Sequence, residues 1–217
     1  MGLTRTCWAT GPRPLRDYEA AVHTYGLLLE MKPDTAVYLY AQSMCYAHLG
    51  DTDNAIDRYH AGNAVQKEDK DEAGRQEALF AAGGACVDAG EYEKAMGLYQ
   101  DAIREGVKHG QVYNQMGLCQ MAEKDYQGAL DSFNQGYETF VTGHSLGSGA
   151  EPAQAAAALN ADARADMALL KELVYNRAVA YEYLSEYKKA LGLFEDYVSV
   201  FGPNEDAEHE IAFLKTR

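Results

Sequence analysis

The sequence predicts an all-α solenoid built from stacked pairs of helices. An alanine recurs at intervals of 34, 40, 34 and 61 residues, at Ala21, Ala55, Ala95, Ala129 and Ala190. An aromatic residue follows each alanine by four positions, so both lie on one helix face, as with Tyr59 and Phe194. A small residue stands twelve positions before four of the alanines, where two antiparallel helices need room to approach: Ser43, Gly83, Gly117 and Ala178.

The stretch from Gly90 to Ala102 is the clearest copy of this unit, and it resembles the turn and second helix of a tetratricopeptide repeat. The 34-residue period is that of the same family. The resemblance implies a right-handed superhelical solenoid of helix-turn-helix repeats with a C-terminal capping helix. It divides the chain into an unpatterned leader (1–16), an array of about four and a half repeats (17–203) with an insertion at 141–170, and a capping helix (204–217).

The first repeat is expected to lack its first helix, because Pro12 and Pro14 interrupt the segment where that helix belongs. Its second helix, predicted over 17–32, is amphipathic and would keep one face without its usual partner. Three arrangements would account for this face. The leader could fold over it with Trp8 and Leu15, a second subunit could cover it, or the native start of the protein could lie further upstream.

The remaining repeats are predicted over 34–67, 76–108, 110–140 and, after the insertion, up to Pro203. Repeat four departs from the pattern in having Lys124 where a glycine usually ends the first helix. The insertion begins with a Gly/Ser-rich loop, and Glu151 and Pro152 then start a helix. We expect that helix to continue without a break through Met167 into repeat five, ending near Leu184.

Composition and charge restrict the classes of function. The chain of 217 residues is 47% hydrophobic, and its 19 basic and 33 acidic residues give a net charge of −14. This charge disfavours nucleic acid and anionic membranes as partners. No apolar run is long enough for membrane insertion, and no secretory signal is evident, so the chain as written is expected to be cytoplasmic. The final eight residues resemble the ends of repeat arrays in some bacterial surface lipoproteins, which implies export if the native N-terminus is missing.

No cofactor or metal site is predicted. The four cysteines, Cys7, Cys45, Cys86 and Cys119, have no metal-ligand spacing, and three of them fall within predicted helices, where a thiol packs as a small apolar group. The six histidines do not cluster, and no phosphate-binding or dinucleotide-binding fingerprint occurs.

One segment matches a catalytic motif. Residues 143–147 read Gly-His-Ser-Leu-Gly, which resembles the nucleophile elbow of lipases, and Asp196 and His209 follow Ser145 in the hydrolase order. An elbow needs a strand before the serine, however, and the residues before it read as helical hairpins. A serine hydrolase is therefore the remote alternative, and the sequence predicts a protein without enzymatic activity.

The family resemblance implies ligand binding on the concave surface, along the first helix of each repeat. The alanine positions map this surface onto Tyr40, Met44, Phe80, Gln111, Asn114, Tyr175 and Asn176, with Glu77, Glu172 and Val179 among the neighbouring positions. Amide side chains can bind a peptide backbone, and aromatic rings can hold apolar side chains. The alternative for these aromatics is packing between neighbouring helices.

The basic residues with which some family members grip a carboxylate are absent from these positions, where Glu77 and Glu172 would repel an acidic peptide. The predicted function is therefore a protein-interaction scaffold that binds a neutral or basic peptide or protein. The alternative is a structural or assembly subunit that forms a homodimer through the N-terminal helix 17–32.

Overall fold

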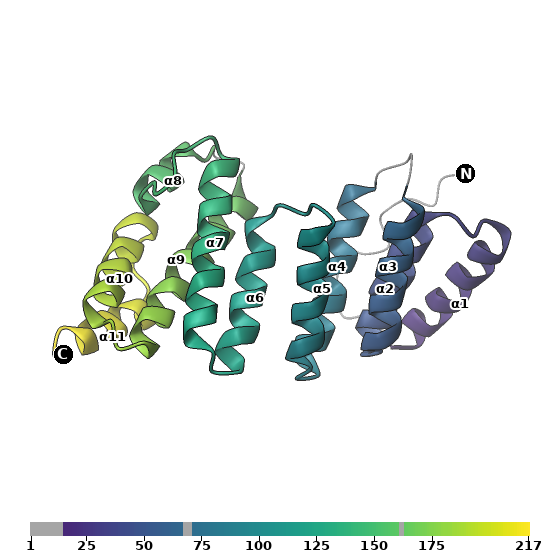
Figure 1. The fold of residues 1–217 in the computed structure, drawn as a ribbon, viewed down its shortest axis with the longest axis horizontal. Coiled ribbons are helices and arrows are strands. Elements are labelled where there is room, and N and C mark those ends of the chain that lie inside the picture. The colour runs from purple at the N-terminus through teal and green to yellow at the C-terminus, as the bar shows by residue number, and fades with distance from the viewer. Residues whose placement is uncertain (1–14, 67–70, 161–162) are drawn as a thin grey trace. The chain divides into compact units, whose positions relative to one another are not determined.

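The computed structural model describes residues 15–66, 71–160 and 163–217 (Figure 1), and the predicted all-α fold is confirmed there. The leader lies outside these residues except for the start of the first helix, and the expectations for Cys7, Trp8, Pro12 and Pro14 lie outside them with it. The described residues form eleven helices and no strand: α1 (Leu15–Met31), α2 (Ala36–Leu49), α3 (Thr52–Val65), α4 (Glu72–Asp88), α5 (Tyr92–Arg104), α6 (Gly110–Ala122), α7 (Tyr126–Gly143), α8 (Pro152–Ala158), α9 (Arg164–Tyr183), α10 (Tyr187–Phe201) and α11 (Glu205–Leu214).

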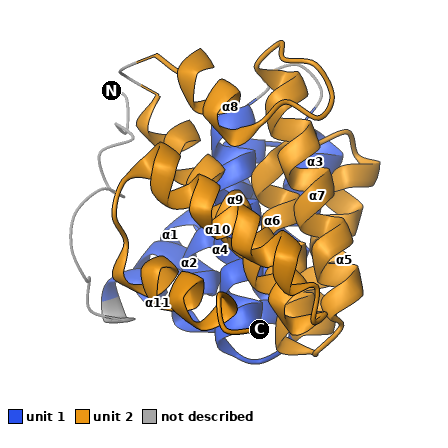
Figure 2. Ribbon diagram, turned by 90° about the vertical axis from the view of Figure 1, so that its left-hand side faces the viewer, with its two compact units in different colours: residues 1–91 blue, residues 92–217 orange. Residues whose placement is uncertain are grey.

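The chain divides into two compact units, residues 1–91 with α1 to α4 and residues 92–217 with α5 to α11 (Figure 2). In the first unit α2 packs against α1, α3 and α4. The Ser43 hydroxyl on α2 donates to the Ala55 carbonyl oxygen on α3 at 2.6 Å, which places a small residue opposite the repeat alanine as predicted. Cys45 is fully buried in this core, and burial raises the pKa of its thiol to about 12. It therefore packs as an apolar group.

Helix α1 differs from the other helices of the first unit, because none of its described side chains is fully buried. Leu27 is 48% exposed and Met31 is 78% exposed, although α1 packs against α2. The prediction that repeat one lacks its first helix concerns the segment before α1, which lies outside the described residues.

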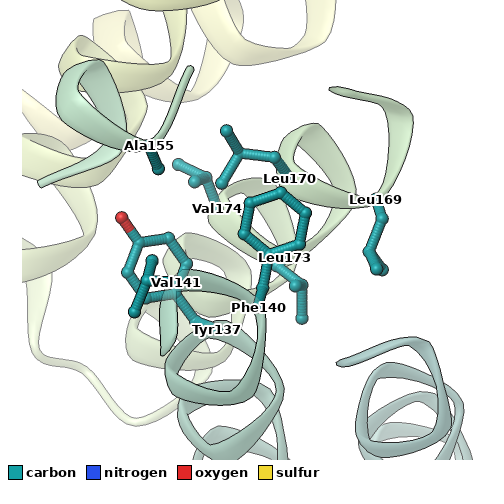
Figure 3. Close-up of a cluster of buried hydrophobic side chains, with 8 residues drawn as sticks. All are labelled: Tyr137, Phe140, Val141, Ala155, Leu169, Leu170, Leu173 and Val174. Atoms are coloured by element: carbon teal, nitrogen blue, oxygen red, sulfur yellow. The ribbon is translucent and has the colours of Figure 1, made fainter. Parts of the chain in front are cut away.

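In the second unit, α6 packs against α7, and α9 packs against both α7 and α10. The insertion folds onto this framework through a cluster of apolar side chains that gathers between α7, α8 and α9 (Figure 3). Tyr137 anchors the loop of the insertion by donating its hydroxyl to the Ala150 carbonyl oxygen at 2.8 Å. Burial raises the pKa of Tyr137 to about 12, so the hydroxyl remains a hydrogen-bond donor.

The continuous helix predicted for the insertion is wrong. Helix α8 starts at Pro152 as expected but ends at Ala158, and α9 begins only at Arg164. The backbone at Leu159 is extended, with φ −79° and ψ 138°, and its side chain packs against the cluster of Figure 3. Helix α8 instead packs against both α9 and α10. Tertiary burial thus overrides the high helix propensity of the alanine run.

Four interhelical turns share one geometry. A residue in the left-handed conformation stands five positions before the repeat alanine each time, at Gly50, Gly90, Lys124 and Ser185. In each turn two backbone N–H groups donate back to the preceding helix, as with Lys124 to the Met121 carbonyl and Asp125 to the Gln120 carbonyl. Lys124 therefore adopts the backbone conformation of a helix-ending glycine, with φ 64°.

Candidate functional site

A hydrogen-bonded network joins α6 to α9 in the second unit. Asn114 on α6 is fully buried, donates through Nδ2 to Glu172 Oε2 at 3.0 Å and accepts through Oδ1 from Asn176 Nδ2 at 2.9 Å. Glu172 and Asn176 are four residues apart and share one face of α9. Because both ends of the Asn114 amide have partners, its burial carries no unsatisfied polar group, and the two helices are fixed relative to each other.

Helix α9 has one buried face and one accessible face. The buried face is apolar and consists of Leu169, Leu170, Leu173, Val174, Ala178 and Ala180. The accessible face follows helical spacing and carries partly or fully exposed side chains of mixed chemistry: Glu172, Tyr175, Asn176, Val179, Glu182 and Tyr183. We call these six residues the α9 face.

Tyr175 is the half-buried centre of the α9 face. Its ring makes edge contacts with Phe194 and Tyr197 of α10, at centroid distances of 5.4 and 5.6 Å. Burial raises the pKa of Tyr175, and the charges of Asp206 and Glu210 on α11 raise it further. Aromatic packing against α10 thus fixes the Tyr175 ring, and the nearby carboxylates of α11 make the electrostatic potential around it negative.

A pocket of about 400 Å³ opens beside this ring, between α9 and the capping helix α11. Its lining residues are Tyr175, Val179, Glu182, Tyr183 and Glu210. Tyr183 is 58% exposed and stacks on Tyr126 of α7, with 4.6 Å between the ring centroids. The pocket therefore combines aromatic and aliphatic walls with two carboxyl groups.

In the first unit, two of the predicted site residues are buried. Tyr40 on α2 is fully buried, with its hydroxyl bonded to the side chains of Asn63 and Gln66 near the end of α3. Met44, one turn later, is also buried, at 9% exposure. Tyr40 therefore presents no surface to a ligand, and the prediction that its ring lines an open groove is corrected to packing between α2 and α3.

The other predicted residues are half-buried. Phe80 lies on α4 in the first unit, and Gln111 lies in the first turn of α6 in the second unit. The Gln111 backbone N–H donates to Nδ1 of His109, at 3.2 Å, and so helps to start α6. The structure thus brings together Asn114, Tyr175 and Asn176 in one unit. Asn114, however, is fully buried, so its predicted place in an open groove is corrected to a contact that joins α6 to α9.

The Gly-His-Ser-Leu-Gly segment begins at the last residue of α7 and forms the turn that follows this helix. Ser145 is exposed and left-handed, with φ 61°, and its backbone N–H donates to the Thr142 carbonyl. The Leu146 N–H donates to the Val141 carbonyl, which repeats the pattern of the interhelical turns. A helix, not a strand, leads into the serine, so the segment lacks the strand-turn-helix geometry that activates a nucleophile elbow.

Two absences hold for the described residues. No group of three or more His, Cys, Asp or Glu side chains in them is arranged to hold a metal ion. None of their helices combines the length and apolar character needed to cross a bilayer.

Sequence reasoning missed Glu182, Tyr183 and Glu210. The first two lie one turn beyond Val179 on the same helix, so extending the mapped stripe to the end of α9 would have found them. Glu210 comes from α11, and only the packing of the cap brings it to the pocket. No local pattern in the sequence indicates that contact.

Two family models, both described as tetratricopeptide repeat, match residues 15–64 and 78–110. No curated protein matches the sequence. Among solved structures, the chain is similar to MamA, with 15% identity and a TM-score of 0.58, over 91% of this chain and 92% of that one.

It is also similar to the C-terminal part of a TPR repeat-containing protein from Cytophaga hutchinsonii, with 17% identity, a TM-score of 0.61, and coverage of 91% of this chain and 65% of that chain. A third similar structure is BtubC from P. vanneervenii, with 11% identity, a TM-score of 0.61, and coverage of 93% and 82%. These likenesses concern the fold. Together with the two family matches and the shared turns, they identify the chain as a tetratricopeptide repeat protein.

Proposed function

We propose that the protein is a protein-interaction scaffold whose α9 face binds an extended or helical peptide of neutral or basic character. The observation that carries this proposal is the division of α9 into a buried apolar face and an accessible face of amide, aromatic and acidic groups. Amides can pair with a peptide backbone, and Tyr175 and Val179 can contact apolar side chains.

Preorganisation supports the same proposal. The Asn114 network and the aromatic contacts below Tyr175 fix the groups of the α9 face before any ligand arrives. A surface that is already ordered loses less side-chain entropy on binding. The net charge of −14 and the two glutamates of the pocket favour a basic partner over an acidic one.

A library of random 12-residue peptides displayed on phage and selected on the full chain tests the proposal. We expect enrichment of peptides that contain Lys or Arg together with apolar residues, and weaker binding of these peptides to Val179→Asp. Leu27→Asp on α1 is the matched control, because it places the same charge on an exposed leucine of the other unit. Failure to enrich any peptide, or equal binding by Val179→Asp and the wild type, would contradict the proposal.

The exposed side chains of α1 favour a second candidate, a subunit that self-associates through this helix. Leu27 and Met31 are exposed apolar groups on an amphipathic helix in which no described side chain is fully buried. Self-association predicts a sedimentation coefficient that rises with protein concentration and a dimer that Leu27→Asp dissociates. A monomer at every concentration would rule this candidate out.

A further inference from the structure

The pocket between α9 and α11 has walls of two kinds. Tyr175 and Val179 supply apolar surface, and Glu182 and Glu210 supply carboxyl groups from two different helices. A lysine or arginine side chain has the same division, with an aliphatic stem and a cationic head. The pocket of about 400 Å³ is large enough to admit such a side chain.

The two carboxyl groups lie close enough to influence each other. Burial raises the pKa of Glu182, and the charge of Glu210 and a hydrogen bond with its carboxyl group raise it further. Asp206 adds negative charge on the α11 side of Tyr175. The pocket thus accumulates negative charge that its own lining residues do not neutralise, since these five residues include no Lys or Arg.

The surrounding basic groups do not remove this imbalance. His209 Nδ1 lies 3.6 Å from Glu210 Oε1, but the His209 side chain is 80% exposed. Lys215, near the C-terminal end of α11, pairs with Glu195 on α10 at 3.0 Å. Two carboxyl groups that repel each other gain most from a cation placed between them, because it offsets both the repulsion and the cost of burial.

We propose that this pocket binds the cationic side chain of a lysine or arginine residue presented by the partner peptide. The head group bonds to the Glu182 and Glu210 carboxylates, and the stem packs on Tyr175 and Val179. The exposed Tyr183 ring provides a π surface for the cation. This inference rests on the proposed function and names the residue type that the α9 face selects.

Small probes test the pocket without any knowledge of the partner. The probes are Nα-acetyl-lysine N-methylamide, its arginine analogue and the uncharged norleucine analogue, each titrated into the full chain while NMR follows the Val179 methyl and Tyr175 ring signals. We expect the lysine or arginine probe to bind at least about tenfold more tightly than norleucine. The ratio of the two cationic probes then shows which head group fits.

Glu210→Gln and Glu182→Gln should each lower the affinity for the cationic probe by about tenfold and leave the affinity for the norleucine probe unchanged. Glu208→Gln is the matched control, because it removes the same charge from an exposed position of α11 outside the pocket, and it should not change binding. Circular dichroism of each variant establishes that it remains folded.

Equal binding of the norleucine and lysine probes, or full binding by both glutamine variants, would overturn the inference. Such a result leaves the proposed function intact if library peptides still need Val179. Conversely, a chain that binds the lysine probe in the pocket but enriches no peptide contradicts the proposed function and leaves the cation pocket in place.

Discussion

Tyr40 and Tyr175 occupy the same position in their repeats, fifteen residues before Ala55 and Ala190, yet their surroundings differ. Tyr40 is fully buried between α2 and α3, and its hydroxyl is bonded within the first unit. Tyr175 is half-buried and lines a pocket in the second unit. Position in the repeat therefore does not decide whether an aromatic ring belongs to the core or to a binding surface.

The residue seven positions after the repeat alanine explains this difference. In the first unit it is Gly62, and a Cβ atom there would lie 2.5 Å from the Tyr40 ring, so the ring rests directly on the α3 backbone. In the second unit it is Tyr197, whose own ring occupies the space beside Tyr175. Gly62 has no side chain, so the Tyr40 ring can pack in the core, whereas the ring of Tyr197 fills the equivalent space and leaves Tyr175 partly exposed.

The largest predicted effect concerns stability. Tyr40→Ala should lower the free energy of unfolding by about 3–5 kcal/mol, because it empties a fully buried ring site. Tyr175→Ala should cost less, about 1–2 kcal/mol, since part of its ring already faces solvent. Urea unfolding of both variants measures the difference. Equal losses would mean that the two rings have the same role.

Gly62→Ala should destabilise the first unit by about 1–3 kcal/mol, because the new methyl group must displace the Tyr40 ring. Gly84→Ala on α4 is the control. Its Cβ would meet no atom within 4 Å, so the gain in helix propensity should stabilise by about 0.5–1 kcal/mol. Opposite signs for these two changes in thermal unfolding would support the close contact of Gly62 with Tyr40, and a stabilising Gly62→Ala would contradict it.

The turns that precede the repeat alanines differ between the units in a second way. Their left-handed residues are Gly50 and Gly90 in the first unit but Lys124 and Ser185 in the second. A side chain in this conformation costs about 1–2 kcal/mol, and glycine loses part of that advantage through its freer unfolded chain. Lys124→Gly and Ser185→Gly should each stabilise by about 0.5–1 kcal/mol, and Gly50→Ala should destabilise by about 1 kcal/mol. Denaturation midpoints that move the other way would reject the shared turn geometry.

The smallest effect is a dependence of cation binding on pH. Because the pKa of Glu182 is raised in the folded protein, this carboxyl group keeps its proton to a higher pH than usual and loses it as the pH rises. The ionised form attracts a cation, so affinity for the lysine probe should increase through that range, and binding should release protons. Calorimetry in two buffers of different ionisation enthalpy measures the release, and Glu182→Gln should abolish it.

His209 needs a separate control in that experiment. Its ring nitrogen Nδ1 lies 3.6 Å from Glu210 Oε1, close enough to influence a cation bound to that carboxylate. His209→Gln removes this contribution. If the pH dependence disappears in His209→Gln and persists in Glu182→Gln, the histidine is its source and the role given to Glu182 is wrong.

The sequence predicted much of the fold because the repeat is local. The spacing of alanines and aromatics anticipated the helix pairs, and the Ser43 contact with Ala55 followed from residue size alone. Contacts between distant residues could not be predicted in this way. The break before α9 depends on packing of the insertion, and the burial of Tyr40 depends on Gly62 in another helix.

The candidate site was predicted in part for the same reason. Tyr175 and Asn176 follow the helical spacing and lie on the α9 face, whereas Asn114 is buried beneath it and Glu210 reaches the pocket only through the fold of the capping helix. The bacterial lipoprotein type and the location in the cell stay predictions from the sequence.

The most direct test of the central claim maps a bound peptide onto the protein. A library-selected peptide is titrated into the isotope-labelled full chain, and backbone and side-chain NMR signals are followed. Binding through the α9 face predicts that the largest changes occur at Tyr175, Val179, Glu182 and Glu210, with little change at Tyr40 and its neighbours in α2 and α3. Changes centred on α2 and α3, with the α9 and α11 signals unmoved, would contradict the assignment.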